Sequence, residues 1–158
     1  MRRTFNRNLV KYWLPVMFWM AFIFWMSTET FASENTLSWI EIVLRSLVPR
    51  ISTQGLDLIH TVIRKAGHVI EYFILGLLLF RTFSSSSISS WSWRWSLYAV
   101  IIVVLWAASD EFHQSFVPTR TASAVDVGID TAAGILAQFV GALWHRYNRR
   151  KYNFNRDN

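Results

Sequence analysis

The sequence contains no cysteine, which excludes disulfide bonds and thiolate metal sites and leaves the redox compartment undetermined. Acidic residues are scarce, because 10 Asp and Glu stand against 16 Lys and Arg, and the formal charge is +6. His68, His113, Asp110 and Glu71 are acceptable ligands for zinc or a harder ion. The HExxH spacing that presents two histidines to zinc on one helix face is missing, however, so we predict no metal site. The long apolar segments lack alternation with a period of two, which argues against β-strands.

Apolar and aromatic residues are what the chain has in quantity. Of its 158 residues 53% are hydrophobic, and nine are Trp. A basic chain can be a nucleic-acid-binding protein or a membrane protein. Here the basic residues flank long apolar segments instead of lining a groove-binding helix. We therefore expect membrane lipids as partners and no nucleic acid.

Four segments are expected to span a membrane, since a spanning helix needs about 20 mostly apolar residues. They cover about residues 9–27, 66–83, 95–109 and 125–144. The first and third are short, and flanking Trp, Tyr and Lys are expected to anchor them at the interface. The first could instead be a cleaved signal peptide, but Pro15 and three Trp favour a retained helix. We predict an all-α integral membrane four-helix bundle that forms a single domain over residues 1–158.

The distribution of basic residues predicts the orientation. Eleven of the 16 Lys and Arg lie before the first span, between the second and third, or after the fourth. The positive-inside rule therefore places both termini in the cytoplasm of a protein embedded in the cell membrane. The Ser-rich stretch 84–90 falls on the same side. The acids lie on the other side, apart from Asp157.

An external amphipathic helix is expected between the first two spans. Apolar residues recur there at helical spacing, at Leu37, Ile40, Val43, Leu44 and Leu47. Such a helix suits the outer membrane surface, and Pro49 is expected to end it. The residues that follow lead into the second span without a helix breaker.

Polar residues gather at the outer ends of the predicted spans, most densely in "SDEFHQSFVPTR", which covers Ser109–Arg120. An ionisable residue within a membrane costs about 2.5–3.5 kcal/mol on insertion scales, so such residues usually face the interior and mark function. The predicted site consists of Lys65, His68, Glu71, Tyr72, Asp110, Glu111, His113, Gln114, Arg120, Asp126 and Asp130.

Within this predicted site, four residues are candidates for catalysis. His113 or His68 would act as the acid or base, oriented by Asp110 or Glu71. Arg120 and Lys65 would hold an anionic group such as phosphate or carboxylate. The remaining candidates for ligand binding are Tyr72, Glu111, Gln114, Asp126 and Asp130.

Simpler interpretations exist for several of these residues. Glu111 would be a solvated charge at a helix end, and His68 a packing histidine bonded to Glu71. Arg120 would pair with an acid and hold its loop. Three glycines of the fourth span are expected to allow close helix contact rather than binding. They are Gly128, Gly134 and Gly141.

Three stretches resemble the signatures of the VanZ-like membrane proteins, a family named for a member associated with reduced susceptibility to the glycopeptide teicoplanin. They are "KAGHVIEYFILGLLL", "SDEFHQSFVPTR" and "DVGIDTAAG", in the same order and spacing as in the family. The resemblance covers roughly residues 28–141 and implies the membrane fold more firmly than a reaction. Two positions depart from it: Thr119 replaces a common Gly, and Asp130 replaces a common Asn. The second departure indicates that this position needs a polar side chain rather than a charge.

Two classes of function follow from these residues. In the first, an extracytoplasmic polar pocket binds or modifies an envelope molecule, such as a lipid-linked wall precursor or a glycopeptide, which makes the protein an enzyme or a binding protein. In the second, a non-catalytic scaffold or partner-docking protein uses the polar residues to lock its helices. Ion conduction is disfavoured because the cytoplasmic half offers no matching acids. The sequence names no cofactor and no oligomeric state.

Overall fold

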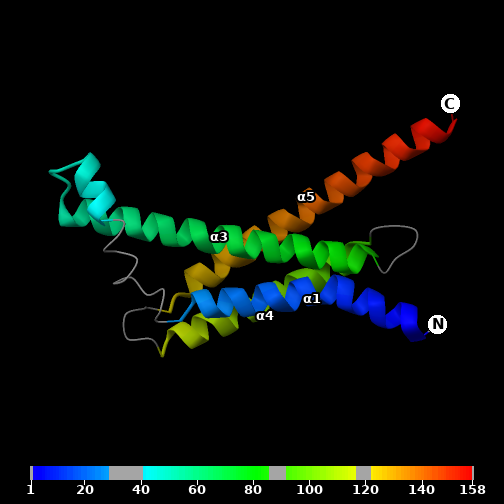
Figure 1. The fold of residues 1–158 in the computed structure, drawn as a ribbon, viewed down its shortest axis with the longest axis horizontal. Helices are drawn as coiled ribbons and strands as arrows, with labels where there is room; N and C mark the ends of the chain where they lie inside the picture. The colour runs from blue at the N-terminus through cyan, green and yellow to red at the C-terminus, as the bar shows by residue number, and fades with distance from the viewer. Residues whose placement is uncertain (1, 29–40, 86–91, 117–121, 158) are drawn as a thin grey trace.

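The computed structural model describes residues 2–28, 41–85, 92–116 and 122–157. Four long α-helices lie in these ranges (Figure 1): α1 (Arg2–Met26), α3 (Thr53–Ser85), α4 (Trp93–Gln114) and α5 (Ala124–Asp157). A short helix covers residues 41–47. Every regular element in the described ranges is helical, so the predicted all-α class is confirmed for that part of the chain.

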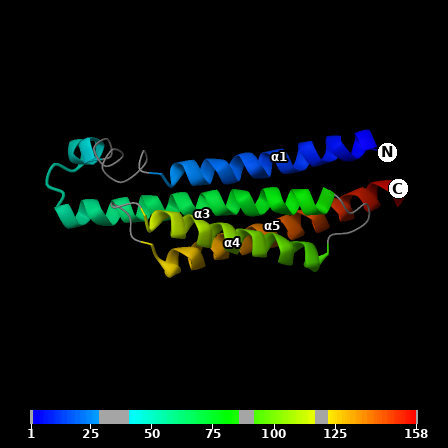
Figure 2. The same cartoon turned by 90° about the horizontal axis from the view of Figure 1, so that it is seen from below.

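Consecutive long helices run in opposite directions and lie side by side (Figures 1 and 2). Helix α3 is the centre of the arrangement, because it packs against α1, α4 and α5, and α4 also packs against α5. Helix α5 crosses α3 and then diverges from it toward the C-terminus (Figure 1). The end of α1, the start of α3, the end of α4 and the start of α5 therefore share one end of the molecule.

Three helices contain stretches long and apolar enough to cross a membrane: Thr53–Ser84, Trp93–Gln114 and Ala124–Arg150. Helix α1 contributes a shorter apolar stretch, Val10–Met26. The helices extend beyond the predicted spans. In particular, α4 continues to Gln114, so Asp110 to Gln114 form its last turn and are not part of a loop.

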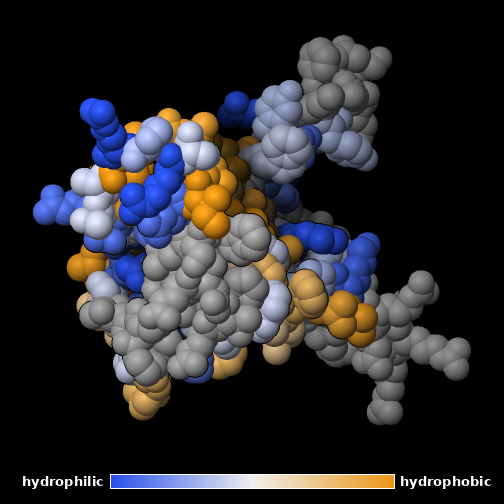
Figure 3. Space-filling model, turned by 60° about the vertical axis from the view of Figure 1, so that its left-hand side comes forward, coloured by the Kyte–Doolittle hydropathy of each residue, from blue (hydrophilic) through white to orange (hydrophobic). Residues whose placement is uncertain are grey.

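The stretch between α1 and α3 contains the short helix 41–47, which ends before Pro49 as expected. The predicted amphipathic helix also included Leu37 and Ile40, which lie outside the described residues. Ile42, Val43 and Leu47 are exposed. Helix α3 then runs from residue 53 to residue 85 without a break, as the absence of a breaker predicted. Figure 3 views this end of the molecule and shows hydrophilic and hydrophobic surface side by side.

Small residues bring α3 and α5 into close contact. A Cβ atom at Gly76 would lie 2.6 Å from the Ala137 Cβ and 3.0 Å from the Gly134 carbonyl oxygen. Gly134 in turn meets Val103 of α4, where an added Cβ would lie 2.7 Å from Cγ1. The prediction of close helix contact is thus confirmed at Gly134. It is also confirmed at Gly141, where an added Cβ would meet the ring of Phe80. It is wrong at Gly128, which has open space around it.

Helix α1 is attached to α3 by two hydrogen bonds, one near the start and one near the middle of its apolar part. The Trp19 indole donates to the Glu71 carbonyl at 2.9 Å, and the Thr82 hydroxyl donates to the Tyr12 carbonyl at 3.0 Å. Val16, between these two contacts, and Ile23, one turn beyond Trp19, are fully buried in the core. These contacts align the end of α1 with the part of α3 that carries the predicted site.

Candidate functional site

The buried face of α4 changes character along its length. Ala99, Val103 and Ala107 are fully buried at intervals of four residues. The same face continues at Asp110 and Gln114, which are each only 2% exposed. Since residues three or four apart share a helix face, the polar residues occupy core positions at this end of the helix.

The buried faces of α3 and α5 also change from apolar to polar residues at this end of the molecule, and their polar residues lie close together. His68 Nδ1 lies 3.4 Å from Asp130 Oδ2, although 62 positions separate the two residues. Asp130 is completely buried, and so is Tyr72, which lies one turn from His68 with its ring parallel to the imidazole. The His68 ring is also within electrostatic range of Glu71 and Asp110. Acids from α3, α4 and α5 therefore surround a single histidine.

One oxygen of the Asp110 carboxylate, Oδ2, accepts a hydrogen bond from a neighbouring side chain. Gln114 Nε2 donates to Asp110 Oδ2 at 3.0 Å and to the Ser27 hydroxyl at 3.2 Å. Ser27 follows α1 and is 3% exposed. We refer to Ser27, His68, Tyr72, Asp110, Gln114 and Asp130 as the polar cluster. Four helices contribute to it, because Ser27 extends it to the end of α1.

Two further contacts fix the helix ends around the polar cluster. The Lys65 ammonium is paired with Asp126 in the first turn of α5, where the helix dipole also favours an acid. Glu111 Oε2 accepts a hydrogen bond from the backbone N–H of Ser123 at 2.7 Å. Glu111 is 5% exposed, so it is a buried tie between α4 and the start of α5 and not a solvated charge.

Three buried oxygen atoms of the polar cluster have no hydrogen-bond partner. They are Oδ1 of Asp110, Oδ1 of Asp130 and the hydroxyl of Tyr72. Both acids are within electrostatic range of Tyr72, which places these groups in one region. Buried polar groups in proteins are nearly always hydrogen-bonded, so unpartnered ones indicate an additional function or an additional bound group.

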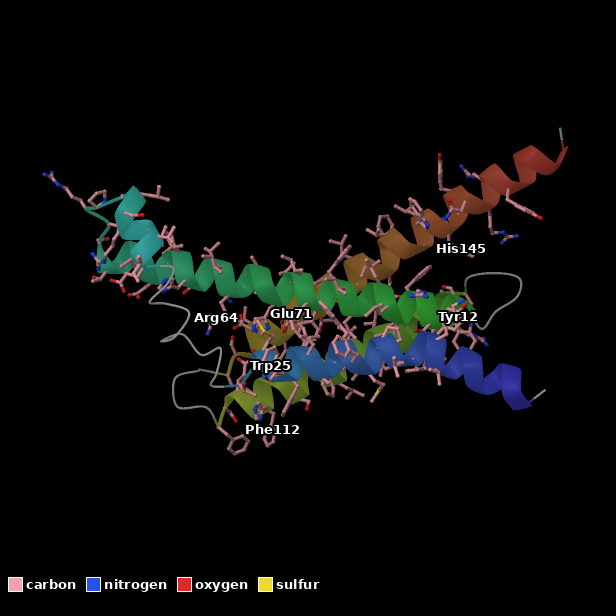
Figure 4. All side chains as sticks on the ribbon, in the orientation of Figure 1. Tyr12, Trp25, Arg64, Glu71, Phe112 and His145 are labelled. Atoms are coloured by element: carbon pink, nitrogen blue, oxygen red, sulfur yellow. The ribbon has the colours of Figure 1, made fainter. Side chains whose placement is uncertain are left out.

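The other predicted residues lie at the edge of the polar cluster or outside the described ranges. His113 packs its ring on Phe24 of α1, with centroids 4.4 Å apart. Among the described residues, no hydrogen bond or ion pair joins His113 to the acids. Glu71 of α3 is half-buried, and Figure 4 shows Phe112 of α4 pointing away from the bundle. Arg120 lies outside the described residues.

Three buried polar residues that connect helices were not predicted from the sequence, namely Ser27, Thr82 and Gln138. Ser27 was not singled out, because a lone serine at the end of an apolar segment carries no signal. Gln138 Nε2 donates to the Gly76 carbonyl at 2.6 Å, two turns beyond Asp130 on α5. Its spacing of eight residues from Asp130 is the one sign that it shares the buried face. Within the described ranges, no group of three or more His, Asp or Glu is arranged to hold a metal ion.

The long apolar helices and the acids buried at one end of them define a class of protein: an α-helical membrane protein with a polar cluster in its helical core. Within that class, the chain belongs to the VanZ/LLP1 family, whose model matches residues 12–145. The predicted family is thereby confirmed. Searches of curated proteins and of solved structures find no match.

Proposed function

We propose that the protein crosses the cytoplasmic membrane four times, with both termini in the cytoplasm and the polar cluster on the outer side. The distribution of the basic residues supports this orientation. The apolar part of α1, Val10–Met26, would be about 25 Å long, and a bilayer accommodates such a short span by local thinning. Helix 41–47 would lie on the outer surface with Ile42, Val43 and Leu47 in the lipid interface.

This topology predicts the result of reporter fusions. Reporters placed after Asn158 and within residues 84–90 are both expected to read as cytoplasmic, because eleven basic residues share that side. A reporter inserted at exposed Pro49, between helix 41–47 and α3, is expected to read as external and serves as the matched control. An external signal from either of the first two sites contradicts the proposed orientation.

The polar cluster is, on this proposal, the place where the protein binds or chemically alters an envelope molecule, such as a lipid-linked wall precursor or a glycopeptide. The observation that supports this most directly is the pair of unpartnered carboxylate oxygens on Asp110 and Asp130, both in the protein core. Acids that served only to lock helices would be expected to use both oxygens, because each unmet buried acceptor destabilises the fold.

The arrangement of the cluster is compatible with acid–base chemistry. Asp130 fixes the ring of His68 through Nδ1, which leaves Nε2 as the atom available to a ligand. Gln114 orients Asp110 in the same manner through Oδ2. Arg120 is proposed to hold an anionic group of the ligand, as its planar guanidinium suits phosphate or carboxylate. An effect on susceptibility to glycopeptide antibiotics would follow from a change in the envelope.

A scaffold or partner-docking protein is the second candidate function, and two contacts favour it. The pair between Lys65 and Asp126 and the bond from Ser123 to Glu111 both join helix ends without leaving a group free for a ligand. In this case the polar cluster would serve only to select one packing of the helices, a role that buried polar groups have in some proteins.

Asp110→Asn tests the binding or catalytic proposal in cells. We expect the variant to be present at normal abundance and to behave like a deletion strain, because Asn keeps the size of Asp but loses its charge. The measurements are protein level, glycopeptide susceptibility and a mass-spectrometric profile of envelope lipids and wall precursors in the same cultures. Asp57→Asn, an exposed acid on the same end of α3, is the matched control and should behave like the unchanged protein.

If Asp110→Asn lowers abundance and phenotype equally, the scaffold function is favoured. A variant with full phenotype and full abundance would remove Asp110 from the site.

A further inference from the structure

The contacts of the polar cluster leave one oxygen unused on each of its two acids. Gln114 occupies Oδ2 of Asp110, and His68 occupies Oδ2 of Asp130. Oδ1 of each acid is buried without a partner, and the hydroxyl of Tyr72 is a third such oxygen. All three side chains are at most 2% exposed. The protein thus holds two unpartnered carboxylate oxygens and one unpartnered phenol hydroxyl, which can accept as well as donate, buried in one region.

Charge in this region is also unbalanced. The imidazole of His68 contacts Asp130 and has Asp110 only within electrostatic range, while the ammonium of Lys65 is already paired with Asp126. Glu111 adds a further acid, whose contact is a backbone N–H and not a basic group. A buried carboxylate without a compensating charge is strongly unfavourable in a protein core. The group that completes the site should therefore be positively charged.

We infer that the polar cluster binds the protonated primary amine of the envelope molecule on which the protein acts. An alkylammonium group carries one positive charge and three N–H donors, which matches the three free oxygens in number and in charge. This inference rests on the proposed function and names the chemical class of its ligand. The amine is the buried end of that ligand.

Other occupants fit these atoms less well. A water molecule donates two hydrogen bonds and carries no charge, so it would leave one oxygen unmet and the acids uncompensated. A quaternary ammonium has no N–H donor and is bound by aromatic faces, whereas the free groups here are oxygens. The described residues offer no three-ligand arrangement for a metal ion. Because the three oxygens are inaccessible to solvent, a bound group has to lose its hydration shell. A compact primary ammonium can replace those hydrogen bonds to water with three direct N–H hydrogen bonds.

The test uses the purified full-length protein in detergent micelles, with ethylammonium chloride as the probe. Ethylammonium is expected to raise the midpoint of thermal unfolding in a concentration-dependent manner, since a ligand that binds only the folded state stabilises it. Tetramethylammonium chloride and sodium chloride at equal concentration are the matched controls and should give no such shift. Asp110→Asn and Tyr72→Phe should each require about tenfold more ethylammonium for the same shift, and Asp57→Asn should respond like the unchanged protein.

Three results would overturn the inference: an equal shift with tetramethylammonium or sodium, no shift with ethylammonium, or an unchanged response in both Asp110→Asn and Tyr72→Phe. Tyr72→Phe keeps the ring and its packing, so it provides a reading even if Asp110→Asn does not fold. If Asp110→Asn abolishes the cellular phenotype while ethylammonium has no effect, the amine is wrong and the proposed function stands.

A comparison of lipid nanodiscs identifies the source of the amine. A higher unfolding midpoint in phosphatidylethanolamine than in phosphatidylcholine discs, lost in Tyr72→Phe, assigns the amine to a lipid headgroup. Equal midpoints in the two discs, together with a response to ethylammonium, assign it to a molecule other than these lipids, such as an amine-bearing wall peptide. Both results support the ammonium class.

Discussion

Gly76→Ala is expected to destabilise the protein by about 1–3 kcal/mol or more, through the addition of a single methyl group. The new Cβ would lie 2.6 Å from the Ala137 Cβ and 3.0 Å from the carbonyl oxygen of Gly134. Backbone atoms cannot rotate away, so α3 and α5 have to separate. Because His68 and Asp130 lie on these same helices, the substitution should also weaken their contact and reduce function.

The chain offers two matched controls for this prediction. Gly67 on α3 and Gly128 on α5 have no atom within 4 Å of a built Cβ. Alanine at either position should be neutral or stabilising, since it lowers the entropy lost on forming a helix. Unfolding midpoints in detergent provide the comparison. A Gly76→Ala protein as stable as the two controls would show that α3 and α5 do not approach as closely as described.

His68→Leu is expected to have the second large effect, because it leaves the carboxylate of Asp130 buried without its basic partner. Asp130 is fully buried, and breaking a buried pair from one side typically costs about 3–5 kcal/mol. The variant should therefore accumulate poorly or unfold early in detergent. The double variant His68→Leu with Asp130→Leu should recover most of this loss, because two apolar side chains replace the pair.

The double variant also separates the two candidate functions. If the polar cluster acts on a ligand, the double variant is stable and has lost the cellular phenotype. If the cluster serves only to pack the helices, stability and phenotype return together. The required measurements are unfolding midpoint, abundance and envelope profile for the unchanged protein, His68→Leu, Asp130→Leu and the double variant, which form a complete double-mutant cycle.

The helices were predictable because apolar length and helical spacing report directly on them. The positions at which the helices end were harder to predict. The third span was predicted to end at residue 109, so Asp110 and Glu111 were expected beyond it, since polarity usually marks the end of a membrane helix. In the structure they extend the buried face of α4, where Gln114 donates to one carboxylate oxygen of Asp110 and the backbone N–H of Ser123 donates to one of Glu111. Only the contacts of the neighbouring helices reveal such partners.

The sequence was sufficient to name most residues of the site, but not to say which of them contact one another. The acids and His68 were recognised because ionisable residues are costly in a membrane, and that cost does not depend on the fold. The partner of His68 proved to be Asp130, 62 residues away, and sequence spacing could not have named it. Ser27 was missed for the same reason, as its role comes from the register between α1 and α4.

The unbroken course of α3 has a mechanical consequence. Thirty-three residues without a break form a rod of about 50 Å, well beyond the roughly 30 Å of a bilayer core. Exposed Leu58 lies on the same rod as His68, about 15 Å away along its axis. A tilt of the N-terminal part of α3 would therefore also move the imidazole of His68, with the close contact at Gly76 as the pivot.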